Sequence, residues 1–117
     1  AEEADFGEKL QPIRSRAEFE ALVGSGKPVV VDFYASWCGK CRQLAPFVDD
    51  LMEKFPSVTF AKVDTDDAAL TDLCAELGVK ALPEFKFYKD GAEIGTSVIG
   101  YKKKPLTQAV KDLAAMA

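Results

Sequence analysis

Two cysteines separated by two residues, Cys38 and Cys41, are the groups in this chain best suited to redox chemistry. An apolar, β-branched run over residues 28–34 precedes them and predicts a buried strand, while an apolar helical pattern over residues 39–54 follows. Such a turn places the Cys38 sulfur at the helix N-terminus, where free N–H groups and the helix dipole stabilise a thiolate. We therefore expect thiol–disulfide exchange, with Cys38 as the nucleophile and the more buried Cys41 as the resolving thiol.

A carboxylic acid interrupts the apolar strand that leads to the cysteines. Asp32 is surrounded in sequence by valines and aromatic residues, and a lone buried carboxylate is costly. Burial should raise its pKa toward the range of a useful acid–base catalyst. The alternative is an aspartate held in the core by a salt bridge.

Composition narrows the possible functions. The 117 residues are 48% hydrophobic, enough for one domain with its own core, and the net charge of −4 argues against a nucleic-acid surface. There is no histidine, which excludes imidazole catalysis and mixed Cys/His metal sites. Three cysteines are too few for a disulfide scaffold, so a reducing compartment fits better. No segment reaches the roughly 20 apolar residues of a membrane span.

Periodicity and turn signals predict a single α/β domain. Residues 1–9 read as an acidic, flexible tail, and residues 10–117 as the domain. The expected order is β-α-β-α-β-α-β-β-α, a five-stranded mixed sheet flanked by four helices. The expected strands are 10–14, 28–34, 57–63, 83–88 and 94–99, and the expected helices are 16–23, 39–54, 68–77 and 105–116. Pro12 favours an edge position for the first strand, and Ser15 with Glu18 predicts a capping box.

With these residues in place, the chain resembles the thioredoxin family over roughly residues 10–116. The matching positions are Asp32, the box Trp37-Cys38-Gly39-Lys40-Cys41, Pro46, Lys62, Pro83, Gly91 and Gly100. The resemblance implies the thioredoxin fold, no cofactor, and protein disulfides or dithiols as substrates. It also implies that Asp32 relays the proton of Cys41 with Lys62 beside it.

Further residues are candidates for contact with substrate. Trp37, directly before the nucleophile, is expected to shield it and to contact substrate rather than only to pack. The resemblance implies a cis bond at Pro83 facing the cysteines, where the neighbouring backbone, including Leu82, pairs with the substrate chain. Gly100 would allow close backbone approach at the same surface, although a turn at a strand end is an alternative. The third cysteine, Cys74, is read as a buried, incidental thiol rather than a regulatory one.

Two positions depart from the usual thioredoxin pattern. Lys40 stands where the family commonly has proline, and Glu84 stands where it usually has threonine. Lys40 adds a cation near the Cys38 sulfur, and loss of the proline loosens the turn at Gly39 and Lys40. A stabilised thiolate predicts a less reducing couple, unless solvent screens the lysine almost entirely.

With lysine at position 40, directly before the second cysteine, the chain resembles atypical thioredoxin-like proteins of plastids. That likeness implies an oxidising role, in which electrons pass from target enzymes to a 2-Cys peroxiredoxin, and a home in the chloroplast stroma, with the cytoplasm as the alternative. The acidic chain has no initiator Met, which fits a processed protein.

Other functions stay open at this point. The chain could be an ordinary reductase fed by a thioredoxin reductase, or a docking module in which redox chemistry is incidental. Two Cys-X-X-Cys halves could also bind a metal in a dimer, although Trp37, Asp32 and Pro83 would then have no role. We expect a monomer.

Overall fold

The computed structural model describes residue 7 and residues 9–117, and most of the predicted tail at residues 1–9 lies outside the described residues. A mixed sheet forms the centre, with strand order β1-β3-β2-β4-β5 and with β6 also paired to β4. The strands are β1 (Gln11–Pro12), β2 (Val29–Tyr34), β3 (Thr59–Asp64), β4 (Glu84–Lys89), β5 (Ala92–Glu93) and β6 (Val98–Ile99). In the centre, β2 runs parallel to β3 and antiparallel to β4. The predicted edge position of β1 is confirmed.

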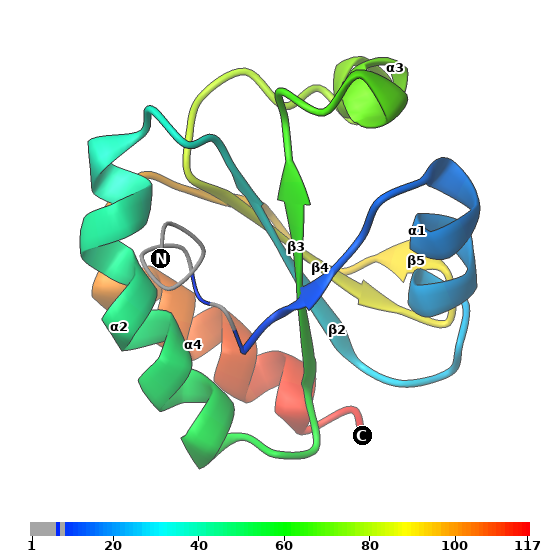
Figure 1. Ribbon diagram of the computed structural model, residues 1–117. Coiled ribbons are helices and arrows are strands. Elements are labelled where there is room, and N and C mark those ends of the chain that lie inside the picture. The colour runs from blue at the N-terminus through cyan, green and yellow to red at the C-terminus, as the bar shows by residue number, and fades with distance from the viewer. Residues whose placement is uncertain (1–6, 8) are drawn as a thin grey trace.

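The described residues form four α-helices. They cover the two faces of this sheet, as Figure 1 shows. Helices α2 (Gly39–Lys54) and α4 (Lys103–Ala114) lie on one face, and α1 (Arg16–Val23) and α3 (Thr71–Glu76) lie on the other. The predicted α/β architecture with a mixed sheet and four helices is therefore confirmed. No helix among the described residues is both long and apolar enough to cross a bilayer.

The prediction of one continuous return strand over residues 94–99 is wrong. Within that segment only Val98–Ile99 form a strand, β6, and a separate short strand, β5, precedes the segment at Ala92–Glu93, so the described residues form a sheet of six strands instead of five. Gly95 lies between them with φ +66°, a left-handed conformation that an extended strand cannot contain. Strand β5 therefore pairs with the end of β4 as a hairpin, and β6 pairs separately with the start of β4.

Two predicted helices also differ in their bounds. The segment predicted at 68–77 begins as a 3-10 turn over Ala68–Leu70, where the Asp67 side chain accepts a hydrogen bond from Ala69 N, and becomes α3 only at Thr71. The last helix starts at Lys103, two residues earlier than predicted. Pro105 is compatible with this start, because the N–H groups of the first helical turn have no acceptor within the helix and the missing N–H of proline costs nothing. The predicted cap of α1 is present, since Ser15 Oγ accepts from Glu18 N at 3.1 Å.

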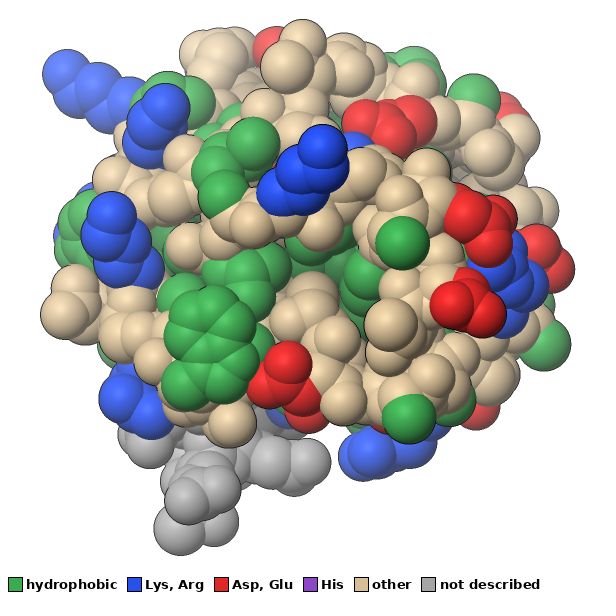
Figure 2. All heavy atoms as spheres, turned by 90° about the horizontal axis from the view of Figure 1, so that it is seen from above, with side chains coloured by type: hydrophobic (Ala, Val, Ile, Leu, Met, Phe, Trp, Pro, Cys, Tyr) green, Lys and Arg blue, Asp and Glu red, His purple; other side chains and the backbone are tan. Residues whose placement is uncertain are grey.

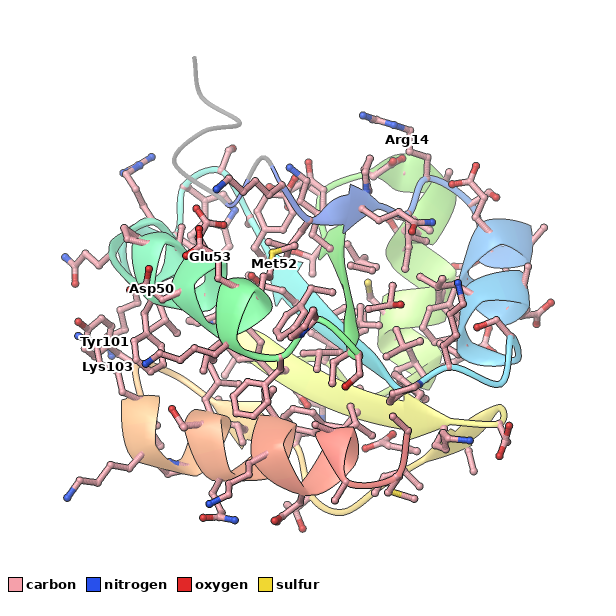
Figure 3. The ribbon with its side chains drawn as sticks, turned by 90° about the horizontal axis from the view of Figure 1, so that it is seen from below. Arg14, Asp50, Met52, Glu53, Tyr101 and Lys103 are labelled. Carbon is pink, nitrogen blue, oxygen red and sulfur yellow. A yellow bond between two sulfur atoms is a disulfide. The ribbon has the colours of Figure 1, made fainter. Side chains whose placement is uncertain are left out.

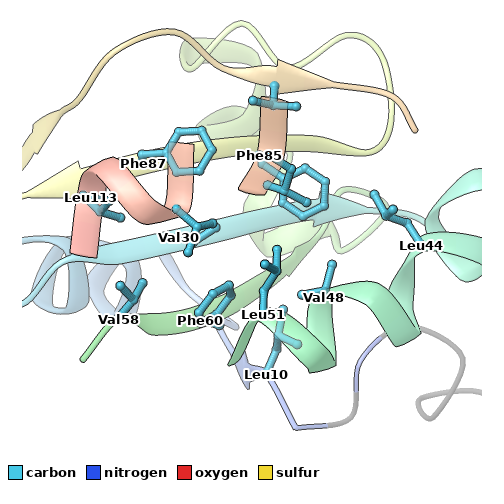
Figure 4. Packing of buried hydrophobic residues seen from close by; sticks show 13 residues of the cluster. Leu10, Val30, Leu44, Val48, Leu51, Val58, Phe60, Phe85, Phe87 and Leu113 are labelled. Atoms are coloured by element: carbon cyan, nitrogen blue, oxygen red, sulfur yellow. The ribbon is translucent and has the colours of Figure 1, made fainter. Parts of the chain in front are cut away.

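The core consists of two apolar clusters separated by the sheet. Figure 4 shows the cluster beneath α2 and α4, in which Val30 of β2 and Phe85 of β4 meet Leu44, Val48 and Leu51 of α2. The opposite cluster joins alternate residues of β2 to α1 and α3. Because side chains alternate along a strand, Asp32 shares the face of Val30, and it therefore points toward the layer of α2.

Candidate active site

Cys38 and Cys41 form a disulfide at the start of α2. Cys38 is the N-cap residue, and its sulfur accepts a hydrogen bond from Cys41 N at 3.2 Å. The predicted position of this sulfur at the helix N-terminus is therefore confirmed. There, the N–H group and the helix dipole favour negative charge on the sulfur once the disulfide is reduced.

The expected difference in burial between the two cysteines is wrong for the disulfide form. Each residue is 6% exposed. Tyr34 and Leu82 pack against the bonded pair, so a neighbouring strand end and the loop before β4 cover both sulfur-bearing residues alike.

Asp32 lies in the interior on β2, as predicted. Only 7% of its surface is exposed, and its Oδ1 is buried with no hydrogen-bond partner among the described residues. Burial raises the pKa of Asp32 to about 7, although the positive charge of Lys62 acts in the opposite direction. The expected shift toward the range of an acid–base catalyst is confirmed, and the carboxyl group gains or loses its proton near neutral pH.

Lys62 is the register partner of Asp32 on β3, and it is 4% exposed. Its Nζ lies 5.8 Å from the centroid of the Tyr34 ring. A small, mostly polar pocket of about 100 Å³ reaches this lysine and is lined by Pro12, Ile13, Arg14, Tyr34, Lys62, Asp64 and Asp67. The structure thus brings Lys62 beside Asp32, as the resemblance implied.

Trp37 is 69% exposed beside the disulfide. Its Nε1 donates a hydrogen bond to Asp66 Oδ2 at 3.0 Å, which fixes the indole although most of the ring is in solvent. A groove of about 290 Å³ runs past the ring and is lined by Trp37, Thr65, Val79, Lys80, Ala81 and Leu82. The indole is therefore held by Asp66 and forms part of the lining of this groove.

Asp66 was not identified as a site residue from the sequence. A signal was present, because strands β2 and β3 are parallel and their carboxyl ends lie at the same edge of the sheet. A polar side chain just after β3 is therefore placed close to the Trp37 turn, which follows β2.

The Leu82–Pro83 peptide bond is cis, as the resemblance implied. Pro83 O accepts a hydrogen bond from Gly100 N at 2.8 Å, so the two predicted substrate-contact positions are adjacent. Gly100 has φ +87°, and a Cβ placed on it would meet no atom within 4 Å. The turn at the end of β6 therefore explains the glycine within the chain itself, and no close approach of the protein's own backbone requires it.

The two departures from the family pattern lie in different environments. Lys40 is exposed in the first turn of α2, whereas Glu84 is 4% exposed. Glu84 Oε2 lies 3.3 Å from Lys86 Nζ, and Lys86 also contacts Glu93 Oε2 at 3.5 Å and Ser97 Oγ at 3.0 Å. The sequence reasoning missed Lys86, although its spacing of two from Glu84 on a strand places both on one face.

Cys74 is not part of the site. It is buried in the cluster beneath α1 and α3, on the other face of the sheet from Asp32, and burial raises the pKa of its thiol. A high pKa disfavours the reactive thiolate, which agrees with the interpretation as a buried, incidental thiol.

Known proteins match both the sequence and this arrangement. Residues 11–112 match the Thioredoxin family model. A thioredoxin H-type 1 from Nicotiana tabacum is 48% identical over 85% of this chain and 76% of its own length.

Two solved structures also match. The oxidised mitochondrial thioredoxin 3 of Saccharomyces cerevisiae has a TM-score of 0.83 and 34% identity, covering 90% of this chain and 96% of that one. A chain from a structure on the thiol resolving mechanism in yeast mitochondrial 1-Cys peroxiredoxin via glutathione/thioredoxin systems also has a TM-score of 0.83, with 33% identity and the same coverage. The family match spans most of the chain and includes the disulfide at the start of α2. This chain accordingly belongs to the thioredoxin family and is a thioredoxin-type thiol–disulfide oxidoreductase.

Proposed function

We propose that Cys38 attacks the target, that Cys41 resolves the mixed disulfide, and that Asp32 takes up the proton of Cys41. The observation that carries this proposal is the position of Cys38 Sγ at the helix N-terminus, on the helix that covers the face of Asp32. Asp32 has a pKa of about 7, so its carboxylate can accept a proton near neutral pH and return it later.

In the reducing direction, the Cys38 thiolate attacks one sulfur of a target disulfide. A Cys38–target bond forms, the target disulfide breaks, and the leaving sulfur keeps the electron pair. Asp32 then accepts the thiol proton of Cys41, and the new thiolate attacks Cys38 Sγ. The Cys38–Cys41 disulfide forms, and the target departs with both sulfurs reduced. The same steps in reverse oxidise a target dithiol.

Substrate contact is assigned to the surface around the disulfide. Leu82 packs on the cysteine pair, and Pro83 and Gly100 present neighbouring backbone at one edge of it. Trp37 directly precedes Cys38, and Trp37 and Leu82 both line one groove. An extended target segment placed across this surface would bring its disulfide to Cys38.

We further propose that this couple is less reducing than that of an ordinary thioredoxin. Lys40 is exposed immediately before Cys41 and two residues after Cys38, in the first turn of α2, where its charge favours the Cys38 thiolate. The test is a redox titration of the protein and of Lys40→Pro. We expect a midpoint above about −270 mV and a lower value for the variant. A midpoint at or below that potential would refute the shift.

The physiological direction follows from this potential. We propose that the protein oxidises target dithiols and passes electrons to a 2-Cys peroxiredoxin, in the chloroplast stroma and as a monomer. The neighbour studied with a peroxiredoxin supports such a partner class. Rapid reduction of an oxidised plastid 2-Cys peroxiredoxin by the reduced protein, with slow insulin reduction in the presence of a thioredoxin reductase, is the expected result.

The second candidate is an ordinary reductase, favoured by the 48% identity to a thioredoxin H-type. Fast, reductase-dependent turnover of insulin together with slow transfer to the peroxiredoxin would establish it. A Cys41→Ser variant, which should hold its targets as mixed disulfides, would then identify the targets from stromal and cytoplasmic extracts.

A further inference from the structure

A groove between α2 and α4 lies outside the surface assigned above. It has a volume of about 420 Å³ and is lined by Phe47, Lys103, Lys104, Thr107 and Gln108. We call it the α2–α4 groove. Among the residues that the structure describes, its lining combines an aromatic ring with two lysines and contains no acidic side chain, in a chain whose net charge is −4.

The α2–α4 groove is close to the disulfide along two routes. Phe47 is eight residues beyond the first residue of α2, or about 12 Å along the helix axis. Gly100 is hydrogen-bonded to Pro83. Lys103 is three residues beyond Gly100, so the chain spans at most about 11 Å from Gly100 to Lys103. A target segment next to the reacting disulfide can therefore extend into the groove.

Lys103 forms one wall of the groove and is held by aromatic rings. Its Nζ lies 5.3 Å from the Phe47 ring centroid and 5.4 Å from that of Tyr101. Figure 3 shows Tyr101 and Lys103 next to each other where α2 and α4 approach, with Asp50 further along α2. Tyr101 is 44% exposed, so the wall offers apolar surface and positive charge together.

The lysines at this end of α4 do not stabilise the helix. Lys102 is the N-cap residue and makes no side-chain capping bond, and the first turn carries no acidic residue. Positive charges at a helix N-terminus oppose the helix dipole. Among the described residues, no ion pair joins Lys102, Lys103 or Lys104 to a carboxylate. Their charge is therefore available to an external anionic group.

The end of the molecule where α2 begins has an uneven charge distribution. Figure 2 shows it from above, with Lys and Arg side chains mostly around the left half and Asp and Glu side chains mostly on the right. Such separation orients an approaching charged partner and raises its rate of association.

We propose that the α2–α4 groove binds an acidic segment of the target protein. An apolar target side chain would pack on Phe47, and neighbouring carboxylates would face Lys103 and Lys104. This inference rests on the proposed function, because the segment belongs to the polypeptide whose disulfide or dithiol meets Cys38. It assigns the substrate class: proteins with glutamate, aspartate and an apolar residue close to the reacting cysteines.

The test uses synthetic peptides that share one intrachain disulfide and differ in their tails. One tail contains glutamate and leucine, a second serine and leucine, and a third lysine and leucine. Stopped-flow reduction by the reduced protein gives the rate constants. The variants are K103Q, K104Q and the K103E/K104E pair, with K54Q and K111Q, exposed lysines in the last turns of α2 and α4, as matched controls.

We expect the acidic tail to react fastest with the unmodified protein, with an advantage that decreases as salt increases. Each glutamine substitution at Lys103 or Lys104 should reduce that advantage about twofold to fivefold, and the paired glutamates should reverse it. K54Q and K111Q should leave it unchanged. Equal rates for the three tails, or an advantage that survives K103E/K104E, would overturn the proposal.

Two further measurements separate this inference from the proposed chemistry. Hydroxyethyl disulfide has no tail, so all variants should reduce it at the same rate. If the unmodified protein does not reduce it, the proposed redox function itself is wrong. An acidic peptide without cysteine should shift the NMR amide signals of Thr107 and Gln108 in the unmodified protein and not in K103E/K104E. Absence of these shifts in the unmodified protein would refute the groove even if disulfide exchange is normal.

Discussion

Asp32 and Lys62 are register partners on the neighbouring parallel strands β2 and β3, and both are buried. Their opposite charges do not cancel, because desolvation outweighs the attraction and raises the pKa of Asp32 to about 7. The pair therefore keeps a carboxyl group with a proton that it can release near neutral pH, in the layer beneath α2. Such a group is costly for stability and useful for proton transfer, and both consequences can be measured.

The first prediction concerns stability and pH. The folded-state pKa of Asp32 is raised above the unfolded value of 3.8, so the folded protein binds more protons between these two values. The contribution of Asp32 to the free energy of unfolding must then fall as pH rises from about 4 to 7 and level off above that. The contribution of Asp32 should decrease by about 2–3 kcal/mol between pH 5 and pH 8.

Urea unfolding of the unmodified protein and of Asp32→Asn checks this prediction. The variant should gain stability relative to the unmodified protein as pH rises through this range. The exposed Asp112, which receives a hydrogen bond from Gln108, offers Asp112→Asn as a control. A difference between Asp32→Asn and the unmodified protein that is the same at both pH values would contradict the raised pKa.

The second prediction concerns the rate of exchange. If Asp32 accepts the proton of Cys41, the resolution step should accelerate as pH rises through about 7. Asp32→Asn should lower this rate at least tenfold and remove that part of the pH profile, since general base catalysis typically contributes 10²–10⁴. Rapid-quench measurement of mixed-disulfide decay reports the step. An unchanged profile in the variant would assign Asp32 a purely structural role.

The third prediction concerns the buried ion pair of Glu84 and Lys86. Lys86→Met leaves the buried Glu84 carboxylate without its counter-charge, so it should cost about 3–5 kcal/mol. Glu84→Leu should cost less, because Lys86 keeps its contacts with Glu93 and Ser97. The double variant should be close to neutral, because two apolar side chains avoid the desolvation cost of both charges. Denaturant unfolding of all four proteins forms a double-mutant cycle. Additive single effects would show that the two charges do not interact.

The fourth prediction concerns the bond between Trp37 and Asp66. Asp66→Ala removes the acceptor of the indole N–H, so the mostly exposed ring should become more mobile. We expect lower fluorescence anisotropy from Trp37 and a twofold to tenfold loss of kcat/KM for a protein disulfide, on the order of 0.5–1.5 kcal/mol. Hydroxyethyl disulfide should react normally. The exposed Asp72→Ala is the control, and an equal effect there would exclude a specific role of the Trp37 bond.

The sequence alone was sufficient for features that depend on short-range chemistry. The apolar run before Cys38 and the helical pattern after it determine that the first sulfur lies at a helix start. Ser15 and Glu18 are three residues apart, so the cap of α1 is local as well. Asp32 could be recognised because a charged residue in an apolar strand has few explanations other than function or a buried pair.

Only the tertiary structure determined contacts between distant segments. The Trp37–Asp66 bond spans 29 residues, and the contact of Lys86 with Ser97 spans 11. The equal burial of Cys38 and Cys41 depends on Leu82 and Tyr34, which come from two different segments. Gly95, in a left-handed conformation, interrupts the strand that the composition of residues 94–99 predicts. Such contacts depend on strand register and loop conformation. Both depend on how the whole chain packs, whereas residues near each other in sequence determine only local preferences.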